Sequence, residues 1–199
     1  MANSNFPFGL RPVGRLSGGV VTGAIRQFSV AAGDATAIFI GDPVKGAGTS
    51  QFIDGNVLTD VVQAATGDVI TGVVVGVKPV TQDSLIYRAA STQRILFVNV
   101  DPDALFEIQQ VAGGTPLTAN DVGLNANFVV AAGSTTTGMS GVTINNVGEA
   151  TTNTLDLKLV EMVNRADNDP GTAVGTGEDK SRFLVRINRH LFSNQVAGA

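Results

Sequence analysis

The chain has 199 residues, of which 43% are hydrophobic and only 15% are charged, with 24 glycines and no cysteine. A charged fraction well below the ~25% of ordinary soluble domains, together with many glycines, favours short strands joined by tight turns and fits a metabolic enzyme poorly. The missing cysteines exclude disulfides, thiol nucleophiles and cysteine-ligated zinc sites. The most apolar stretch, Val69–Val77, is too short to cross a bilayer as a helix, so no membrane association is predicted.

The formal net charge of −4 is unevenly distributed along the chain. Residues 1–33 carry Arg11, Arg15 and Arg26 and no acid, whereas residues 34–83 carry six aspartates against two lysines. A basic segment ahead of an acidic body suits an acidic protein neighbour better than nucleic acid, because strong phosphate binding needs more than three neutralising contacts. The sequence therefore predicts a protein partner and no nucleic acid.

Residues 1–18 are predicted to form an irregular, extended N-terminal arm, because Pro7 and Pro12 remove backbone donors and favour extended geometry in the residues before them. Large apolar side chains that this short segment cannot bury by itself follow at Phe6, Phe8 and Leu10. Two interpretations are open: the arm folds back over its own core, or it docks on a neighbouring subunit. On the second interpretation the candidate partner interface consists of Phe6, Pro7, Phe8, Leu10, Arg11, Pro12 and Arg15.

From Val20 onwards the pattern indicates short strands separated by turns. The strands expected in chain order are Ala24–Val30, Ala37–Ile40, Val57–Ala64, Val69–Val77, Arg94–Val100 and Phe106–Val111. Asp42-Pro43 and Asp54-Gly55 mark turns, since proline presets φ and glycine accepts a positive φ.

The two late strands have the clearest patterns. Leu155–Leu159 alternates apolar and charged residues, and Phe183–Leu191 places Phe, Val and Ile at alternate positions, as in a strand with one buried face. The polar, glycine-rich segment 164–180 between them is expected to be a long loop, as is a second segment near 131–147.

The best helical candidate is Thr118–Phe128, in which Thr118 is a possible N-cap, but Gly123 and several Asn and Asp residues limit it to one or two turns. The predicted fold class is therefore mainly β: an antiparallel β-sandwich or β-barrel with an extended N-terminal arm and at most one or two short helices. Residues 19–199 are expected to form a single β-rich domain.

Residues suited to catalysis or metal binding are few, and the sequence predicts no enzyme, no cofactor and no metal site. His190, the only histidine, has no evident nucleophile or orienting partner and is assigned a structural role. Asp101-Pro102-Asp103 is better suited to capping the local backbone than to hydrolysis. The acidic turn 167–171 has too few ligands for calcium, and the segment 175–181 lacks the glycine that precedes the lysine of a phosphate loop.

Three segments resemble the decoration, or cement, proteins of tailed bacteriophages: Asn5–Val13 (NFPFGLRPV), Asn99–Gln109 (NVDPDALFEIQ) and Phe183–His190 (FLVRINRH). The resemblance implies a β-barrel or sandwich that sits on the outer head surface as a dimer or trimer at the seams between capsomers. It implies the major capsid protein as partner and no catalytic residues. The expected location is the outer capsid surface of the virion, after synthesis in the bacterial cytoplasm.

Two alternative hypotheses for the function are also open. The first is another structural protein of the same particle, such as a tail, fibre or shell subunit, although a main shell subunit is normally longer and contains a substantial helix. The second is a carbohydrate-binding β-sandwich. Such proteins usually stack sugars on aromatic platforms, and this chain has no Trp and one Tyr.

Overall fold

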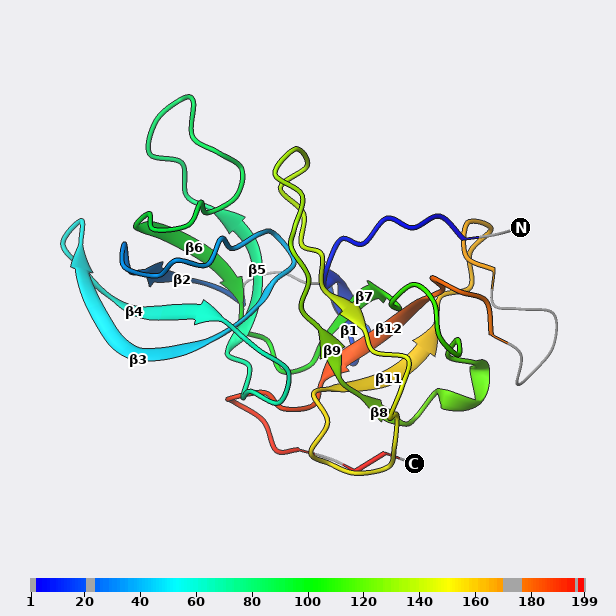
Figure 1. Ribbon diagram of the computed structural model, residues 1–199. Helices are drawn as coiled ribbons and strands as arrows, with labels where there is room; N and C mark the ends of the chain where they lie inside the picture. Colours follow the sequence, from blue (N-terminus) through cyan, green and yellow to red (C-terminus); the bar gives the residue numbers. More distant parts are fainter. Residues whose placement is uncertain (1–2, 21–23, 170–176, 196, 199) are drawn as a thin grey trace.

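The computed structural model describes residues 3–20, 24–169, 177–195 and 197–198, and the fold is mainly β, as predicted. In chain order the strands are β1 (Arg11–Arg15), β2 (Ile25–Val30), β3 (Pro43–Ile53), β4 (Asn56–Gln63), β5 (Gly72–Val77), β6 (Arg94–Asn99), β7 (Ala104–Gln109), β8 (Asn125–Ala126), β9 (Phe128–Val129), β10 (Thr143–Ile144), β11 (Leu157–Met162) and β12 (Arg182–Ile187). They form a closed barrel at one end of the molecule and a five-stranded sheet at the other (Figure 1).

The short helix forms where the sequence predicts it. The described residues contain one 3-10 helix, η1 (Ala119–Asp121), and Thr118 is its N-cap. The Thr118 hydroxyl accepts a hydrogen bond from the Asn120 N–H, and the Asp121 carboxylate accepts one from the Thr118 N–H. This reciprocal capping satisfies backbone donors that a single helical turn leaves free.

The barrel consists of β2, β4, β3, β5 and β6 in that order around the ring. Antiparallel pairing of β2 with β6 and a parallel bridge between Ser29 and Asp60 close it. Its interior is a cluster of mainly β-branched side chains, namely Val30, Ile38, Val44, Val61, Val74, Leu96, Val98 and Val100. The β3–β4 hairpin continues past the barrel and ends in the Asp54-Gly55 turn, where both residues have a positive φ.

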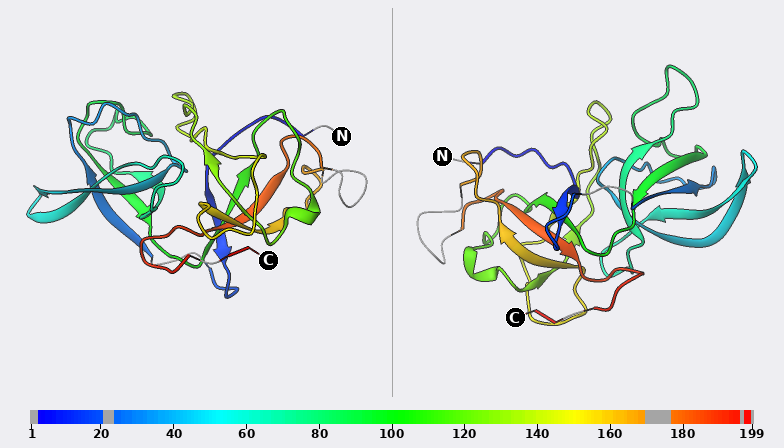
Figure 2. Two further views of the ribbon diagram at one scale, coloured as in Figure 1. Left: turned by 60° about the horizontal axis from the view of Figure 1, so that its bottom comes forward. Right: turned by 180° about the vertical axis from the view of Figure 1, so that it is seen from behind.

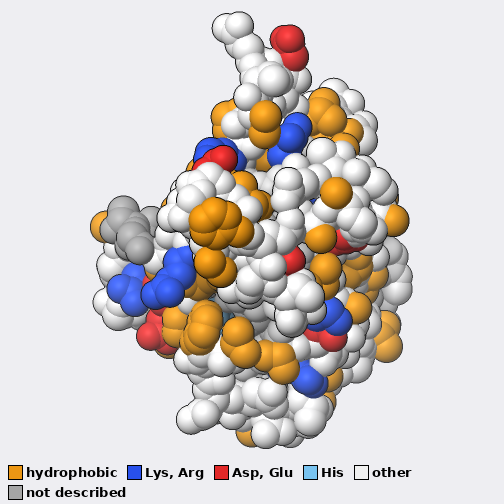
Figure 3. Space-filling model, turned by 90° about the vertical axis from the view of Figure 1, so that its left-hand side faces the viewer, with side chains coloured by type: hydrophobic (Ala, Val, Ile, Leu, Met, Phe, Trp, Pro, Cys, Tyr) orange, Lys and Arg blue, Asp and Glu red, His pale blue; other side chains and the backbone are white. Residues whose placement is uncertain are grey.

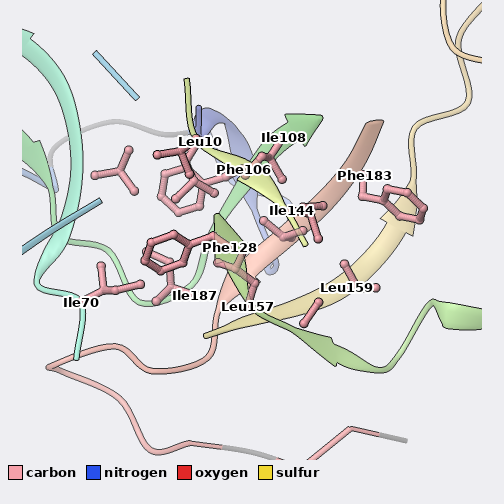
Figure 4. Packing of buried hydrophobic residues seen from close by; sticks show 14 of the residues in the cluster. Leu10, Ile70, Phe106, Ile108, Phe128, Ile144, Leu157, Leu159, Phe183 and Ile187 are labelled. Carbon is pink, nitrogen blue, oxygen red and sulfur yellow. The ribbon is translucent and has the colours of Figure 1, made fainter. Parts of the chain in front are cut away.

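The second unit is the antiparallel sheet β1-β7-β12-β11-β8, with the β9–β10 pair beside it. Alternate residues of β12 point into its core, so Phe183, Val185 and Ile187 are buried, which confirms the predicted alternation. They belong to one buried cluster with Phe106 and Leu157 of the neighbouring strands, and Figure 4 shows Ile187 and Phe183 at different ends of it. Each such fully buried side chain contributes ~1.5–3 kcal/mol to stability through the area that it removes from water.

The barrel is inserted in the chain between β1 and β7 of the sheet, and its base packs against the sheet unit. Ile70 and Val73, at the base, belong to the same buried cluster as Phe106. Ile70 also forms a backbone bridge with His190 just after β12. The chain between residues 19 and 199 thus has two hydrophobic clusters with a shared boundary; that it forms a single domain stays a prediction.

The N-terminal arm lies against the barrel through two glycines. Gly9 and Gly41 both have a positive φ, of 70° and 96°, which favours glycine. The Leu10 N–H donates to the Gly41 carbonyl at 2.9 Å. A Cβ atom on Gly41 would lie 2.4 Å from the Phe8 carbonyl oxygen, so only glycine permits this approach.

Most of the predicted strands are present, but several elements differ. The two-residue strands β8 and β9 overlap the segment considered helical, and β10 lies within the predicted 131–147 loop. Residues 37–40 are not a strand: Ile38 and Ile40 make only single bridges, to Arg88 and Met139. The arm, predicted to be irregular, contains the strand β1. The strand β3, eleven residues long, was not predicted at all.

Candidate functional site

The first residues of the arm cross the outer face of the sheet and are held there by side-chain amides. Asn3 exchanges hydrogen bonds with the backbone of Asp169, at 2.7 and 3.1 Å, and donates to the Asp179 carbonyl at 3.1 Å. Gln109 of β7 accepts a hydrogen bond from the Phe6 N–H and donates to the Asn5 side chain. Because the arm covers this face, the Gln109 side chain is buried although it points away from the apolar core.

Beneath the arm lies a buried carboxylate surrounded by arginines. Glu107 is 1% exposed, and it accepts two hydrogen bonds from Arg165, at 2.8 and 3.0 Å, and one from Arg11 at 2.5 Å. Arg182 lies 3.9 Å from the same carboxylate. Burial by itself raises the pKa of Glu107, but the hydrogen bonds from Arg165 and Arg11 outweigh burial and hold the pKa below its ordinary value.

The arginines of this cluster also contact the arm through an aromatic ring. The guanidinium carbons of Arg11 and Arg182 lie 4.8 and 5.6 Å from the centre of the Phe8 ring. Such cation–π contacts contribute ~0.5–2 kcal/mol each, depending on exposure. At the other end of β1, Arg15 pairs with Asp101 at 2.6 Å.

The arm therefore finds its acidic partners within its own chain. Arg11 and Arg15, which the sequence analysis assigned to a partner interface, are paired with Glu107 and Asp101. Five of the six aspartates between residues 34 and 83 form ion pairs or hydrogen bonds within the protein, namely Asp34, Asp42, Asp54, Asp60 and Asp68. The sixth, Asp83, is exposed. Three of these aspartates, Asp34, Asp54 and Asp68, form ion pairs within the molecule.

The seven predicted interface residues fall into two groups. Leu10 is fully buried in the sheet core and Phe8 is 8% exposed. At these two residues the arm therefore folds back on its own core. Phe6 is 53% exposed. The remaining residues are partly or largely accessible at the surface, namely Pro7, Arg11, Pro12 and Arg15.

An apolar groove of about 330 Å³ lies where the arm meets the barrel. We call it the arm groove; its lining includes Phe6, Phe8, Arg11, Ile40, Val75 and Met139. Val75 reaches it because a bulge in β5, between Val74 and Gly76, leaves this residue without a partner in β6. The lining comes from the arm, the barrel and the 131–142 loop, so the groove exists only when all three are in place.

A second accessible surface follows the outer edge of the sheet. β1 is an edge strand, and a bulge between Pro12 and Gly14 leaves Val13 unopposed by β7 and 47% exposed. Leu16 and Val20, in the segment after β1, are 52% and 80% exposed. We call Val13, Leu16 and Val20 the apolar ridge. Sequence reasoning missed it, because nothing local reveals that β1 lies at an edge or carries a bulge.

The residues considered for catalysis or metal binding form hydrogen bonds or ion pairs with neighbouring groups of the protein. His190 is 2% exposed, its Nδ1 accepts a hydrogen bond from the Phe192 N–H, and burial lowers its pKa to about 4. Asp101 accepts the Asp103 N–H, which confirms the predicted backbone cap. Asp167 pairs with Arg165 and Arg182. The rest of the acidic turn (170–171) and the start of the phosphate-loop-like segment (175–176) lie outside the described residues.

Two further observations concern only the described part of the chain. It contains no group of three or more His, Asp or Glu side chains arranged to hold a metal ion. No helix within it combines the length and the apolar character needed to traverse a bilayer.

Asp42 connects the loop beside the groove to the barrel. Its carboxylate is fully buried and accepts hydrogen bonds from the Ser140 hydroxyl, the Phe39 N–H and the Gln63 amide. Burial raises its pKa from 3.8 to about 6, because these three hydrogen bonds offset only part of the desolvation. The folded protein therefore binds a proton more tightly at Asp42 than the unfolded chain does.

This raised pKa predicts a pH-dependent effect of Asp42→Asn. Between about pH 4 and pH 6 the folded state holds a proton that the unfolded state has lost, so Asp42 makes the wild type less stable as the pH rises. An asparagine amide replaces the protonated carboxyl, with its NH2 group facing Ser140. We expect Asp42→Asn to be more stable than the wild type at pH 7.5, by up to ~3 kcal/mol, and equal to it near pH 4.

Urea unfolding at the two pH values measures this difference. Asp83→Asn, at the exposed aspartate of the barrel, is the matched control and should change neither value. A variant that is less stable than the wild type at pH 7.5 would mean that the charged carboxylate is the better partner for Ser140.

Comparison of the chain with protein-family models, with curated proteins and with solved structures finds no match in any of the three.

Proposed function

We propose that this chain is a structural protein of a tailed-phage particle, which binds the outer surface of the head and stabilises the capsid lattice by bridging neighbouring subunits. The observation that carries the proposal is spatial. The segments that resemble decoration proteins contain or overlap β1, β7 and β12. These strands are consecutive neighbours in one sheet, so the resemblance defines one contiguous part of the molecule.

The partner in this proposal is the major capsid protein, and we assign the apolar ridge to it. The ridge lies at the edge of the sheet that carries the resemblance, and its three side chains are exposed apolar groups whose burial by a partner is favourable. Leu10 and the Arg11–Glu107 pair fix the arm to the sheet. Val13 is therefore presented on a rigid strand, with Leu16 and Val20 in the segment that follows it, which lowers the entropy cost of docking at Val13.

A protein that bridges neighbouring capsid subunits needs little binding affinity per copy. A protein that binds only the assembled, expanded shell stabilises that state by mass action. Because a shell fails only when many contacts open together, and because a clamp that bridges two subunits gains effective concentration, a few kcal/mol per copy suffice.

The test is binding to undecorated, expanded heads, measured by co-sedimentation with the purified protein. We expect saturation at a fixed number of copies per head and greater resistance of the heads to heat. Val13→Ser combined with Leu16→Ser should reduce binding at least about tenfold without changing the fold, since both side chains are largely exposed. Val147→Ser, which removes a 66% exposed valine from a loop away from the ridge, is the control. Wild-type protein that does not bind expanded heads would refute the proposal.

The alternative of a tail, fibre or shell subunit is separated by copy number. A protein that decorates the head is present in purified virions in proportion to the major capsid protein, whereas tail and fibre proteins are present in far fewer copies. Quantitative mass spectrometry of virions distinguishes these cases.

A further inference from the structure

The end of the barrel farthest from the arm carries two apolar side chains that the monomer does not bury. Phe52 and Val57 are directly opposed across the β3–β4 hairpin, next to its turn, and they are 76% and 73% exposed. Figures 1 and 2 show this hairpin tip projecting away from the rest of the molecule, on the side opposite to the arm. Figure 3 looks onto this end and shows hydrophobic side chains spread over the face, with charged groups between them.

The arm groove is of a size that accommodates such side chains. Its volume of about 330 Å³ is near the lower end of the ~300–1,000 Å³ range of ligand pockets, which suits an aromatic side chain with a small neighbour better than a large cofactor. Its apolar walls, including Ile40, Val75 and Met139, offer an aromatic anchor the kind of surroundings that a binding hot spot requires.

The tip also offers the groove an ion-pair partner. Asp54, beside Phe52, is the only charged residue between positions 46 and 59, and its pair with Lys78 is exposed and easily exchanged. The groove carries Arg11 and Arg182 on its wall. The cluster around them has three arginines against Glu107 and Asp167, which leaves one positive charge in excess.

We propose that the hairpin tip of one copy of this chain binds in the arm groove of a second copy, with Phe52 as the apolar anchor and Asp54 facing Arg11. The tip points away from the arm that lines the groove of its own copy (Figure 1), so the partner groove belongs to a second copy. Each copy has one tip and one groove, so the contact is head-to-tail, and such contacts close into rings or continue as open chains. The proposal goes beyond capsid binding, which we assign to the apolar ridge, and each can fail without the other.

The first test is the mass of the full-length protein in solution, measured by sedimentation velocity over a range of concentrations. We expect a multiple of the monomer mass. Phe52→Ser should raise the dissociation constant at least about 30-fold, as loss of a buried aromatic anchor does. Val75→Phe, which fills the groove and leaves the tip intact, should have the same effect. Phe192→Ser removes a 58% exposed phenylalanine elsewhere and should leave the mass unchanged.

The second test uses the absence of cysteine from the chain. Val57→Cys places a thiol beside the anchor, and Val75→Cys places one in the groove. When the two variants are mixed and mildly oxidised, we expect the mixed disulfide-linked dimer to predominate over either homodimer. Val147→Cys mixed with Val75→Cys should give only background linkage.

Two outcomes would overturn the inference. One is a wild-type protein that stays monomeric at every concentration, whether or not it binds heads, since the tip would then have no second copy as its partner. The other is preferential linkage of Val57→Cys to itself, which would show that the tips pair with one another.

Discussion

Replacing Arg88 with methionine is expected to lower the free energy of unfolding by about 3–5 kcal/mol, the cost of removing one partner from a buried charged network. Arg88 is completely buried in the barrel. Its guanidinium donates to the Thr92 carbonyl at 2.7 Å, to the Ala31 and Asp34 carbonyls at 2.9 Å, and to the Thr36 carbonyl.

Methionine has a similar length and no donor, so four carbonyl groups lose a charged hydrogen-bond donor. The Ala31 and Asp34 carbonyls keep backbone N–H donors, from Asp34 and Ser91, whereas those of Thr36 and Thr92 keep none within the described residues. Each unsatisfied buried acceptor costs ~1–3 kcal/mol, and local rearrangement recovers part of that. Arg88→Lys should recover little, because one ammonium group cannot reproduce the planar fork of a guanidinium.

Urea denaturation followed by circular dichroism measures this loss. Arg94→Met, at a half-buried arginine of the same barrel that makes no polar contact within the described residues, should change stability by less than ~0.5 kcal/mol. A loss below ~1 kcal/mol for Arg88→Met would mean that water reaches these carbonyls.

The features that the sequence predicted correctly depend on local pattern. Phe183, Val185 and Ile187 alternate with polar residues, and β12 buries those three. The Asp54-Gly55 dipeptide predicted a turn, and both residues have a positive φ. Local alternation and turn chemistry suffice for such elements because neither depends on a distant partner.

The elements that the sequence did not predict depend on partners elsewhere in the chain. β3 contains Gly46-Ala47-Gly48, which breaks any alternation, and it is extended because β4 pairs with it on both sides of a bulge that Asp60 holds through Thr49 and Gln51. β1 contains Pro12, which a strand tolerates only at an edge or bulge, and no local signal shows that β1 is an edge strand.

For the same reason, only part of the candidate site could be predicted from the sequence. The apolar residues of the arm were recognised as unable to bury themselves, but Leu10 is covered by the core of its own sheet and Phe6 is not. One of the contacts that place the arm is the ion pair of Arg11 with Glu107, 96 residues further along the chain. Composition and spacing cannot reveal a contact at that separation.

The Glu107 cluster carries the second large prediction. In the double variant Arg11→Ala/Arg165→Ala, Glu107 stays buried with only Arg182 near it, at 3.9 Å. We expect a loss of about 2–3 kcal/mol at pH 7. This is less than the ~3–5 kcal/mol typical of a fully buried pair, because the Arg11 and Arg165 side chains are 52% and 42% exposed and water screens part of the interaction.

The loss should depend on pH in a defined direction. In the wild type the pKa of Glu107 lies below its ordinary value of 4.5, so the cluster stabilises the fold above that pH, and this contribution disappears as the pH falls through the folded-state pKa. Without the two arginines only Arg182 opposes the effect of burial, so the pKa of Glu107 rises and the variant is penalised most at neutral pH. The difference between wild type and variant should therefore be largest at pH 7 and shrink towards pH 3.

Adding Glu107→Gln to the double variant separates charge from packing. The amide has the same shape without the charge, so it should restore part of the stability at pH 7 and remove the pH dependence of the difference. Arg26→Ala/Arg94→Ala, which removes two barrel arginines without ion-pair partners in the described residues, controls for the change in net charge. If the double variant at the cluster is no less stable than this control at pH 7, the arm is held by Leu10 and the glycine contact with the barrel alone. The arginines would then serve only to line the groove.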